Sequence, residues 1–237
     1  MSREQKYTAI ILKKQPFNEG DEIITFYTKE NGKVRGLAKS IKSSKSKFQQ
    51  RLQTLFLVNI ILAGGKFPKI ISVETVEVFL SLRENLAAIK IAFYALEVLL
   101  KSTADEEKNE FLFNLLVELF NFLNTNADEN ILDLGLAKFK IKVLDELGLS
   151  IRRPENFTTQ KLFFSPVRGG FFTDRTGDAV SLSPSVIYLF EFTKQKSFNQ
   201  LASAGQSEGL NELQELLSNF ISYQLERKLK SEVYLKM

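Results

Sequence analysis

The spacing of the hydrophobic residues changes near residue 80, and this change constrains the fold more than any other feature of the sequence. Up to Phe79 the apolar runs are short, rich in β-branched and aromatic residues, and separated by turn-forming residues. Beyond Leu80, apolar residues return every three or four positions, which is typical of helices. We therefore expect an α+β protein with a strand-rich domain over 1–80 and a mainly helical domain over 81–237.

The N-terminal part contains five candidate strands. Asn31–Gly32, between the second and third, tolerates a positive φ and suits a hairpin turn. Five short strands fit a small closed barrel, and the OB-fold is a five-stranded barrel that binds nucleic acid. The expected strands are 7–12, 23–27, 33–38, 53–62 and 69–79.

The C-terminal part is interrupted once. Proline and glycine residues break the helical pattern near 152–178, where the runs KLFFS and GGFFT resemble a short strand pair. Gly148 is a plausible helix stop before this insert, and Ser183–Pro184 is a good helix start after it. Helices are expected over 83–102, 109–124, 129–147 and about 209–229.

The chain contains no Cys and no His. This absence removes disulfides, thiolate and imidazole metal sites, and the nucleophile systems that depend on histidine. Catalysis would have to rest on carboxylates, Lys or Tyr. The tightest acidic group of the barrel, Glu19, Asp21 and Glu22, is more typical of a turn than of a hydrolase site. We therefore expect a binding protein rather than an enzyme.

No apolar run approaches the roughly 18 residues that a membrane-spanning helix needs. The first residues, MSREQKYTAI, lack the apolar core of a signal peptide. A cytoplasmic location is the expectation that follows.

Charge is distributed unevenly along the chain. Residues 1–80 hold 14 Lys or Arg and 7 Asp or Glu, a net charge of +7, whereas the remainder has a net charge of −3. Opposite signs in the two parts indicate two modules with different partners.

The stretch from Lys33 to Arg51 concentrates the positive charge, with seven Lys or Arg in 19 residues and no Asp or Glu. Lysines act as point charges on phosphate, and serine hydroxyls can donate to phosphate oxygens. Lys33 and Arg35 alternate along one strand, so both point to the same face. The alternative is a solvated loop whose lysines aid solubility. The expected nucleic-acid contacts are Lys13, Lys33, Arg35, Lys39, Lys42, Lys45, Lys47, Phe48 and Arg51.

Single-stranded nucleic acid also stacks on aromatic side chains, which contributes about 1–3 kcal/mol per base. The chain has no Trp, so Phe and Tyr would have to serve. Any one of them is more often a core residue. Phe48, beside Lys47, is the best exposed candidate, and the other candidates are Phe17, Phe26, Tyr27 and Phe67.

The N-terminal run NEGDEIITFYTKENGKVRGLAKSIKSSKSKFQQRLQTLFLVNI resembles the signature of RecO, a family of bacterial recombination mediators. At the far end, NFISYQLERKLKSEVYL is similar to the closing helix and tail of that family. The resemblance covers essentially the whole chain. The matching features are Glu19 before Asp21, IITFYT, Asn31–Gly32–Lys33, Ala38–Lys39, Lys45–Ser46, Leu52–Gln53, and then Tyr223, Leu225, Leu229, Lys230 and Ser231.

This resemblance implies an N-terminal OB-fold barrel and a helical C-terminal domain. It also implies a cytoplasmic, nucleoid-associated protein that binds single-stranded and double-stranded DNA and anneals complementary strands. The implied partners are the acidic tail of the single-stranded-DNA-binding protein SSB, RecR, and indirectly RecA, which is loaded on SSB-coated DNA. The alternative is an OB-fold protein that binds RNA or is associated with translation.

One departure from the family concerns metal. Many members carry four cysteines around the Gly169–Gly170 turn in a zinc-binding insert. Here Thr173 and Thr176 stand about where the second pair would be. Since threonine is not a structural zinc ligand, we expect no cofactor and no metal. The neighbouring phenylalanines could supply hydrophobic packing in its place.

The SSB tail would need an apolar pocket with a cation beside it. Lys138, which precedes Phe139, matches a position where the family carries a basic residue before an aromatic one. Lys142 shares its helix face at i,i+4 spacing. These two lysines are the expected tail contacts. The alternative is a solvated helix edge on which Lys142 pairs with Glu146.

Overall fold

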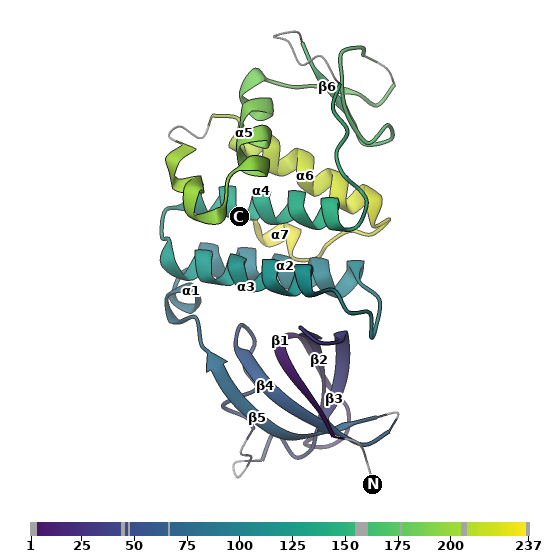
Figure 1. Ribbon diagram of the computed structural model, residues 1–237, viewed down its shortest axis with the longest axis vertical. Coiled ribbons are helices and arrows are strands. Elements are labelled where there is room, and N and C mark those ends of the chain that lie inside the picture. The colour runs from purple at the N-terminus through teal and green to yellow at the C-terminus, as the bar shows by residue number, and fades with distance from the viewer. Residues whose placement is uncertain are drawn as a thin grey trace. The chain divides into compact units, whose positions relative to one another are not determined.

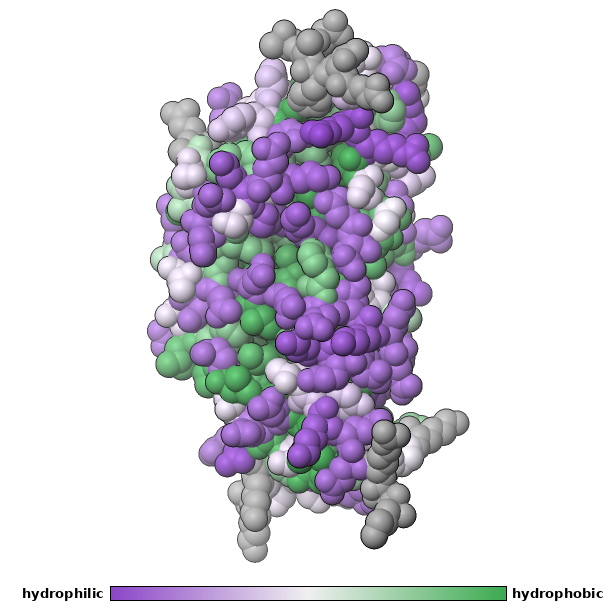
Figure 2. Space-filling view, viewed as in Figure 1, coloured by the Kyte–Doolittle hydropathy of each residue, from purple (hydrophilic) through white to green (hydrophobic). Residues whose placement is uncertain are grey.

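The structure is a computed structural model that describes residues 4–43, 46, 48–65, 67–154, 161–175, 177–204 and 208–235. The chain forms two compact units, one of residues 1–84 and 96–117, the other of residues 85–95 and 118–237. Among the described residues, no helix has the length and apolarity needed to cross a membrane. Figure 2 shows hydrophilic residues over most of one face and hydrophobic residues in smaller patches.

The first unit contains a closed five-stranded barrel, as the turn and strand pattern predicts (Figure 1). The strand order is β1-β2-β3-β5-β4, and β4 pairs with β1 to close the ring. All pairs are antiparallel except β3 with β5, which meet at the single pair Leu37 and Lys69. The strands are β1 Glu4–Pro16, β2 Glu22–Thr28, β3 Gly32–Ala38, β4 Leu57–Ala63 and β5 Lys69–Glu77.

Alternation along the strands fills the barrel interior. Ile24 and Phe26 of β2 are fully buried in the core cluster, together with Val34 of β3. Thr25 and Tyr27, on the opposite face of β2, are also buried. Lys33, the β3 partner of Tyr27, donates to the carbonyls of Leu100 and Thr103, which belong to the same unit. The strands therefore bury residues on both sides.

On the side of β3 that faces away from β2, backbone hydrogen bonds engage both ends of the strand. The Glu106 amide donates to the Lys33 carbonyl, and the Leu37 amide donates to the Pro68 carbonyl. Gly32 makes the first contact possible, because a Cβ at this position would overlap the Glu107 carbonyl, and its φ is +60°. The hairpin predicted at Asn31–Gly32 is confirmed.

Residues 83–102 were expected to form one helix, and the structure divides that stretch into α1 Leu80–Glu84 and α2 Leu86–Ser102. The cause is Asn85, whose side chain accepts a hydrogen bond from the Ala88 amide and caps α2. The next expected helix is found as α3 Glu110–Thr125. The domain boundary at residue 80 stays a sequence-based prediction.

In the second unit, α4 Glu129–Glu146 packs against α5 Pro184–Gln195, η1 Phe198–Ala204 and α6 Leu210–Gln224. Asp128 caps its first turn, and Gly148, with φ +73°, follows its last turn as predicted. Most of its circumference is buried, since its neighbours surround it. The final helix was expected to reach Leu229, but it ends at Gln224 and a separate short helix follows, α7 Glu232–Leu235.

The insert forms a small sheet of β6 Phe163–Ser165, β7 Gly170–Phe172 and β8 Val180–Ser181. The predicted pair is β6 with β7. Phe164 lies edge-on to Phe171 and to Phe220 of α6, while Phe171 lies edge-on to Phe190 of α5. These rings attach the sheet to the helices.

Candidate nucleic-acid interface

The basic stretch is distributed over β3 and the turns that follow it. Lys39 and Lys42 are exposed in the first of these turns, and Lys13 is exposed on β1. Lys45 and Lys47 lie outside the described residues.

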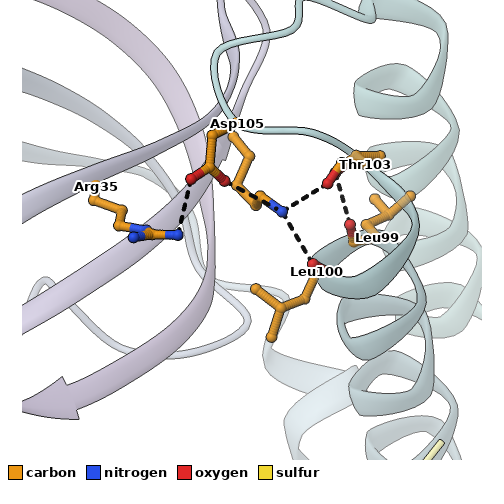
Figure 3. A network of polar contacts seen from close by, with 6 residues as sticks. Arg35, Leu99, Leu100, Thr103 and Asp105 are labelled. Atoms are coloured by element: carbon orange, nitrogen blue, oxygen red, sulfur yellow. Dashed lines mark hydrogen bonds and ion pairs between the residues drawn. The ribbon is translucent and has the colours of Figure 1, made fainter. Parts of the chain in front are cut away.

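Lys33 and Arg35 point to the same face of β3, as expected, and both contact Asp105 (Figure 3). Their surroundings differ. The ammonium of Lys33, a residue only 8% exposed, donates to the carbonyls of Leu100 at 3.1 Å and Thr103 at 2.7 Å, and lies 3.3 Å from Asp105. The Arg35 side chain is 63% exposed and donates to Asp105 at 2.8 Å. Lys33 therefore fixes the loop after α2, while Arg35 remains accessible to solvent.

Lys13 lies on the same face as Arg35. It pairs with Thr25 across β1 and β2, and Thr25 pairs with Arg35 across β2 and β3. Antiparallel partners point to the same side of a sheet, so one residue separates the two cations. Lys14 pairs instead with Ile24, whose side chain fills the core, and burial lowers the pKa of Lys14 while Glu22 opposes the shift.

The turn that carries Lys39 and Lys42 is held against the turn between β1 and β2. The Ser40 amide donates to the Asp21 carboxylate at 2.7 Å, and the Lys42 amide donates to the Gly20 carbonyl at 3.3 Å. Asp21 thus has the turn role expected from the sequence. The two lysines project from a turn whose backbone is fixed at several points.

Phe48 and Arg51 connect the following turn to the barrel. Phe48 is partly buried against the barrel core, and the Arg51 guanidinium donates to the Val73 carbonyl at 3.0 Å. Among the aromatic candidates, Phe26 and Tyr27 are fully buried. The most exposed are Phe17, at 52%, and Phe67, at 71%. Both lie in turns at strand ends, where side chains are often exposed. This position in the sequence could have identified them as better stacking candidates than Phe48.

In the helical unit, Lys138 is only 5% exposed. Its ammonium donates to the carbonyls of Thr193 and Lys196 and lies 5.7 Å from the ring centre of Phe198. The pKa of Lys138 is lowered to about 8, mainly by burial and also by the charge of Lys142, while the charge of Glu118 opposes the shift. Lys142 is partly exposed.

A second buried lysine escaped the sequence analysis. Lys140 is fully buried, and its ammonium donates to Gln214 Oε1 and Ser218 Oγ, both at 2.7 Å. It also lies 4.9 Å from the ring centre of Tyr94. Burial raises the pKa of the nearby Asp133 carboxyl, while Lys140 opposes the shift. The sequence pattern does not distinguish the buried Lys140 from the lysines beside it, because its acceptors lie more than seventy residues away in the chain.

The insert does not fit zinc. Its turn offers no thiolate and no imidazole, and the exposed Thr173 is a hydroxyl. Hydrogen bonds hold the turn instead: Ser165 donates to Asp178, and Arg168 pairs with Asp174 at 2.9 Å. Among the described residues, no group of three or more His, Cys, Asp or Glu could hold a metal ion.

Two family profiles together match almost the whole chain. The one described as Recombination protein O N terminal matches residues 1–79, and the one described as Recombination protein O C terminal matches residues 83–232. Their limits agree with the change in hydrophobic spacing near residue 80.

Several curated relatives carry the name DNA repair protein RecO. The one from Dehalococcoides mccartyi (strain CBDB1) is 27% identical over 241 residues, which cover 97% of this chain and 94% of the relative. The one from Pelotomaculum thermopropionicum is 28% identical and covers 97% and 93%. The one from Clostridium novyi is 33% identical over 144 residues, 60% of this chain and 56% of the relative. With both profiles matched in order, the chain belongs to the RecO family of DNA repair and recombination proteins.

Proposed function

We propose that this chain is a recombination mediator that binds single-stranded and double-stranded DNA through its barrel and anneals complementary strands. The observation that carries the proposal is the set of accessible cations on the barrel: Lys13 and Arg35 on one face, and Lys39 and Lys42 in the turn after β3. The net charge of +7 over residues 1–80 supports it.

Annealing by such a surface requires no bond-making residue. Cations that neutralise phosphates reduce the repulsion between two strands and concentrate both strands locally. If about five phosphates of a single strand are engaged, the slope of log affinity against log salt should be near −3.5. Lysine contacts of this kind carry no base preference, so the activity would be independent of sequence.

The partners belong to the same proposal. We infer that the chain binds the acidic tail of SSB on the helical unit and acts with RecR to load RecA, within the cytoplasm and at the nucleoid. Of the two lysines predicted for the tail, Lys142 is better placed, because it is partly exposed. The ammonium of Lys138 already donates to two backbone carbonyls.

The test uses two complementary oligonucleotides, each coated with SSB. Duplex formation is followed with and without the protein, and then repeated with an SSB that lacks its acidic tail. Acceleration that depends on the tail is the expected result. If duplex formation does not accelerate although DNA or RNA binding is salt-sensitive, the annealing proposal is wrong and an RNA-binding role becomes the better explanation.

A further inference from the structure

A groove of about 530 Å³ opens along β3 in the first unit. Part of its floor is one row of residues across the sheet: Gln15 pairs with Ile23, and Ile23 pairs with Leu37. Beyond Leu37 the row reaches β5. Ile23 and Leu37 are partly exposed, unlike Thr25 and Tyr27 further along β2. Ile23 and Leu37 therefore form a short apolar strip in the floor of the groove.

Two exposed aromatic rings line this strip. Phe17 lies just after β1, and Phe67 lies between β4 and β5. Neither belongs to the barrel core, although most phenylalanines of the chain are buried. The Phe17 amide donates to the Asp21 carbonyl at 3.1 Å, and Pro68, which follows Phe67, accepts from the Leu37 amide at 2.8 Å. A ring whose own or adjacent backbone is hydrogen-bonded loses less entropy when a flat ligand stacks on it.

Polar groups complete the lining. Gln5, Gln15 and Asn31 carry side-chain amides, and Arg35 carries an accessible guanidinium. Amides both donate and accept, as the edges of unpaired bases do. The acidic residues of the lining are at the opposite end from Phe17. There the Asp105 carboxylate is neutralised by Lys33 and Arg35.

We propose that this groove binds the unpaired bases of single-stranded DNA, with bases stacked on Phe17 and Phe67. The proposal rests on the proposed function and deepens it, since the lysines described above hold phosphates and do not distinguish single from double strands. Lys69 ends this row and Lys13 lies in the next row on the same face, so the charge beside the groove favours an anionic ligand over a neutral peptide segment. The two rings and the side-chain amides favour nucleic-acid bases over an acidic peptide, whose carboxylates neither stack on rings nor donate hydrogen bonds. The stacked bases of a duplex cannot reach these rings, so the groove would confer a preference for single strands.

The test compares an oligothymidylate of about 15 nucleotides with an abasic strand of the same length and charge. The variant is F17A/F67A. The matched control is F93A/F111A, which removes two other rings that are 45% and 46% exposed. Wild type should bind the oligothymidylate more tightly than the abasic strand. F17A/F67A should weaken oligothymidylate binding roughly 10- to 100-fold, with the salt slope and abasic binding unchanged. F93A/F111A should bind like wild type.

Rescue with F17W/F67W guards against a folding defect, because tryptophan restores the stacking surface and should restore the affinity. Equal wild-type affinities for the two strands would overturn the base-binding groove while leaving the proposed DNA-binding function in place. An F17A/F67A variant that binds oligothymidylate as wild type does would also overturn it and would reassign the groove to a protein segment. If wild type binds neither strand, the proposed function itself fails.

Discussion

Lys39 and Lys42 of the barrel are exposed on a turn, whereas Lys138 and Lys140 of α4 are 5% and 0% exposed. All four stand in lysine-rich stretches of the sequence. The turn lysines are accessible to a phosphate group. The ammonium of Lys138 instead donates to backbone carbonyls, and that of Lys140 donates to a side-chain amide oxygen and a hydroxyl of the same unit. A count of lysines therefore overstates the charge that the helical unit can offer a partner.

The largest effect is expected from Lys140→Ala. The change leaves Gln214 Oε1 and Ser218 Oγ without their donor and opens a cavity beside Tyr94. The free energy of unfolding should fall by about 3 kcal/mol. Lys142→Ala, on the same helix and partly exposed, should change it by less than about 0.5 kcal/mol. Urea denaturation measures both, and similar losses would erase the contrast between the two lysine environments.

The double variant Lys39→Ala/Lys42→Ala tests the exposed side of the comparison. Removing two phosphate contacts should weaken single-strand binding roughly 10-fold at moderate salt and flatten the salt slope by about 1.4. The free energy of unfolding should not change. Lys196→Ala/Lys228→Ala removes the same charge from exposed positions of the helical unit and serves as the control. Equal losses in the two variants would mean that only net charge matters.

Lys138 should give the protein a distinctive pH dependence. Its pKa is about 8 in the folded state and should return to its ordinary value of 10.5 on unfolding. Below pH 8 both states carry the proton, so this group contributes no slope. Between about 8 and 10.5 only the unfolded state carries it, so the free energy of unfolding should rise with pH, by at most about 1.4 kcal/mol per pH unit.

Lys138→Met should abolish that rise. Urea denaturation measures the free energy of unfolding of wild type and variant across this range. Subtracting the two values at each pH removes the contribution of tyrosines and other lysines and leaves that of Lys138. Parallel pH profiles would show that Lys138 remains charged in the folded state throughout the range.

Asp105→Asn should have the smallest effect. It releases Arg35 from its ion pair and adds one accessible cation to the barrel face. Binding of single-stranded DNA should tighten about threefold, and the salt slope should steepen by up to about 0.7. Glu106→Gln makes the same change in charge at the next position without touching that pair. If Glu106→Gln tightens DNA binding as much as Asp105→Asn does, the higher affinity would come from net charge alone.

The fold was largely predictable because the strands and helices follow from local spacing and turn residues. The break at Asn85 was missed because one capping side chain outweighed a continuous helical pattern. Burial of Lys33, Lys138 and Lys140 could not be predicted, since their acceptors lie 55 or more residues away in sequence. The exposure of Phe17 and Phe67 likewise depends on how the turns pack against the sheet, and the spacing of hydrophobic residues does not reveal this packing.

The two backbone bonds that close the outer edge of β3 have a consequence for how the barrel meets other chains. An open strand edge is a template for intermolecular pairing and aggregation. With Lys33 and Leu37 engaged, only the stretch around Arg35 remains, which is too short for a foreign strand to add to the sheet. The β3 side of the groove can thus stay open to a ligand without offering a template for intermolecular strand pairing.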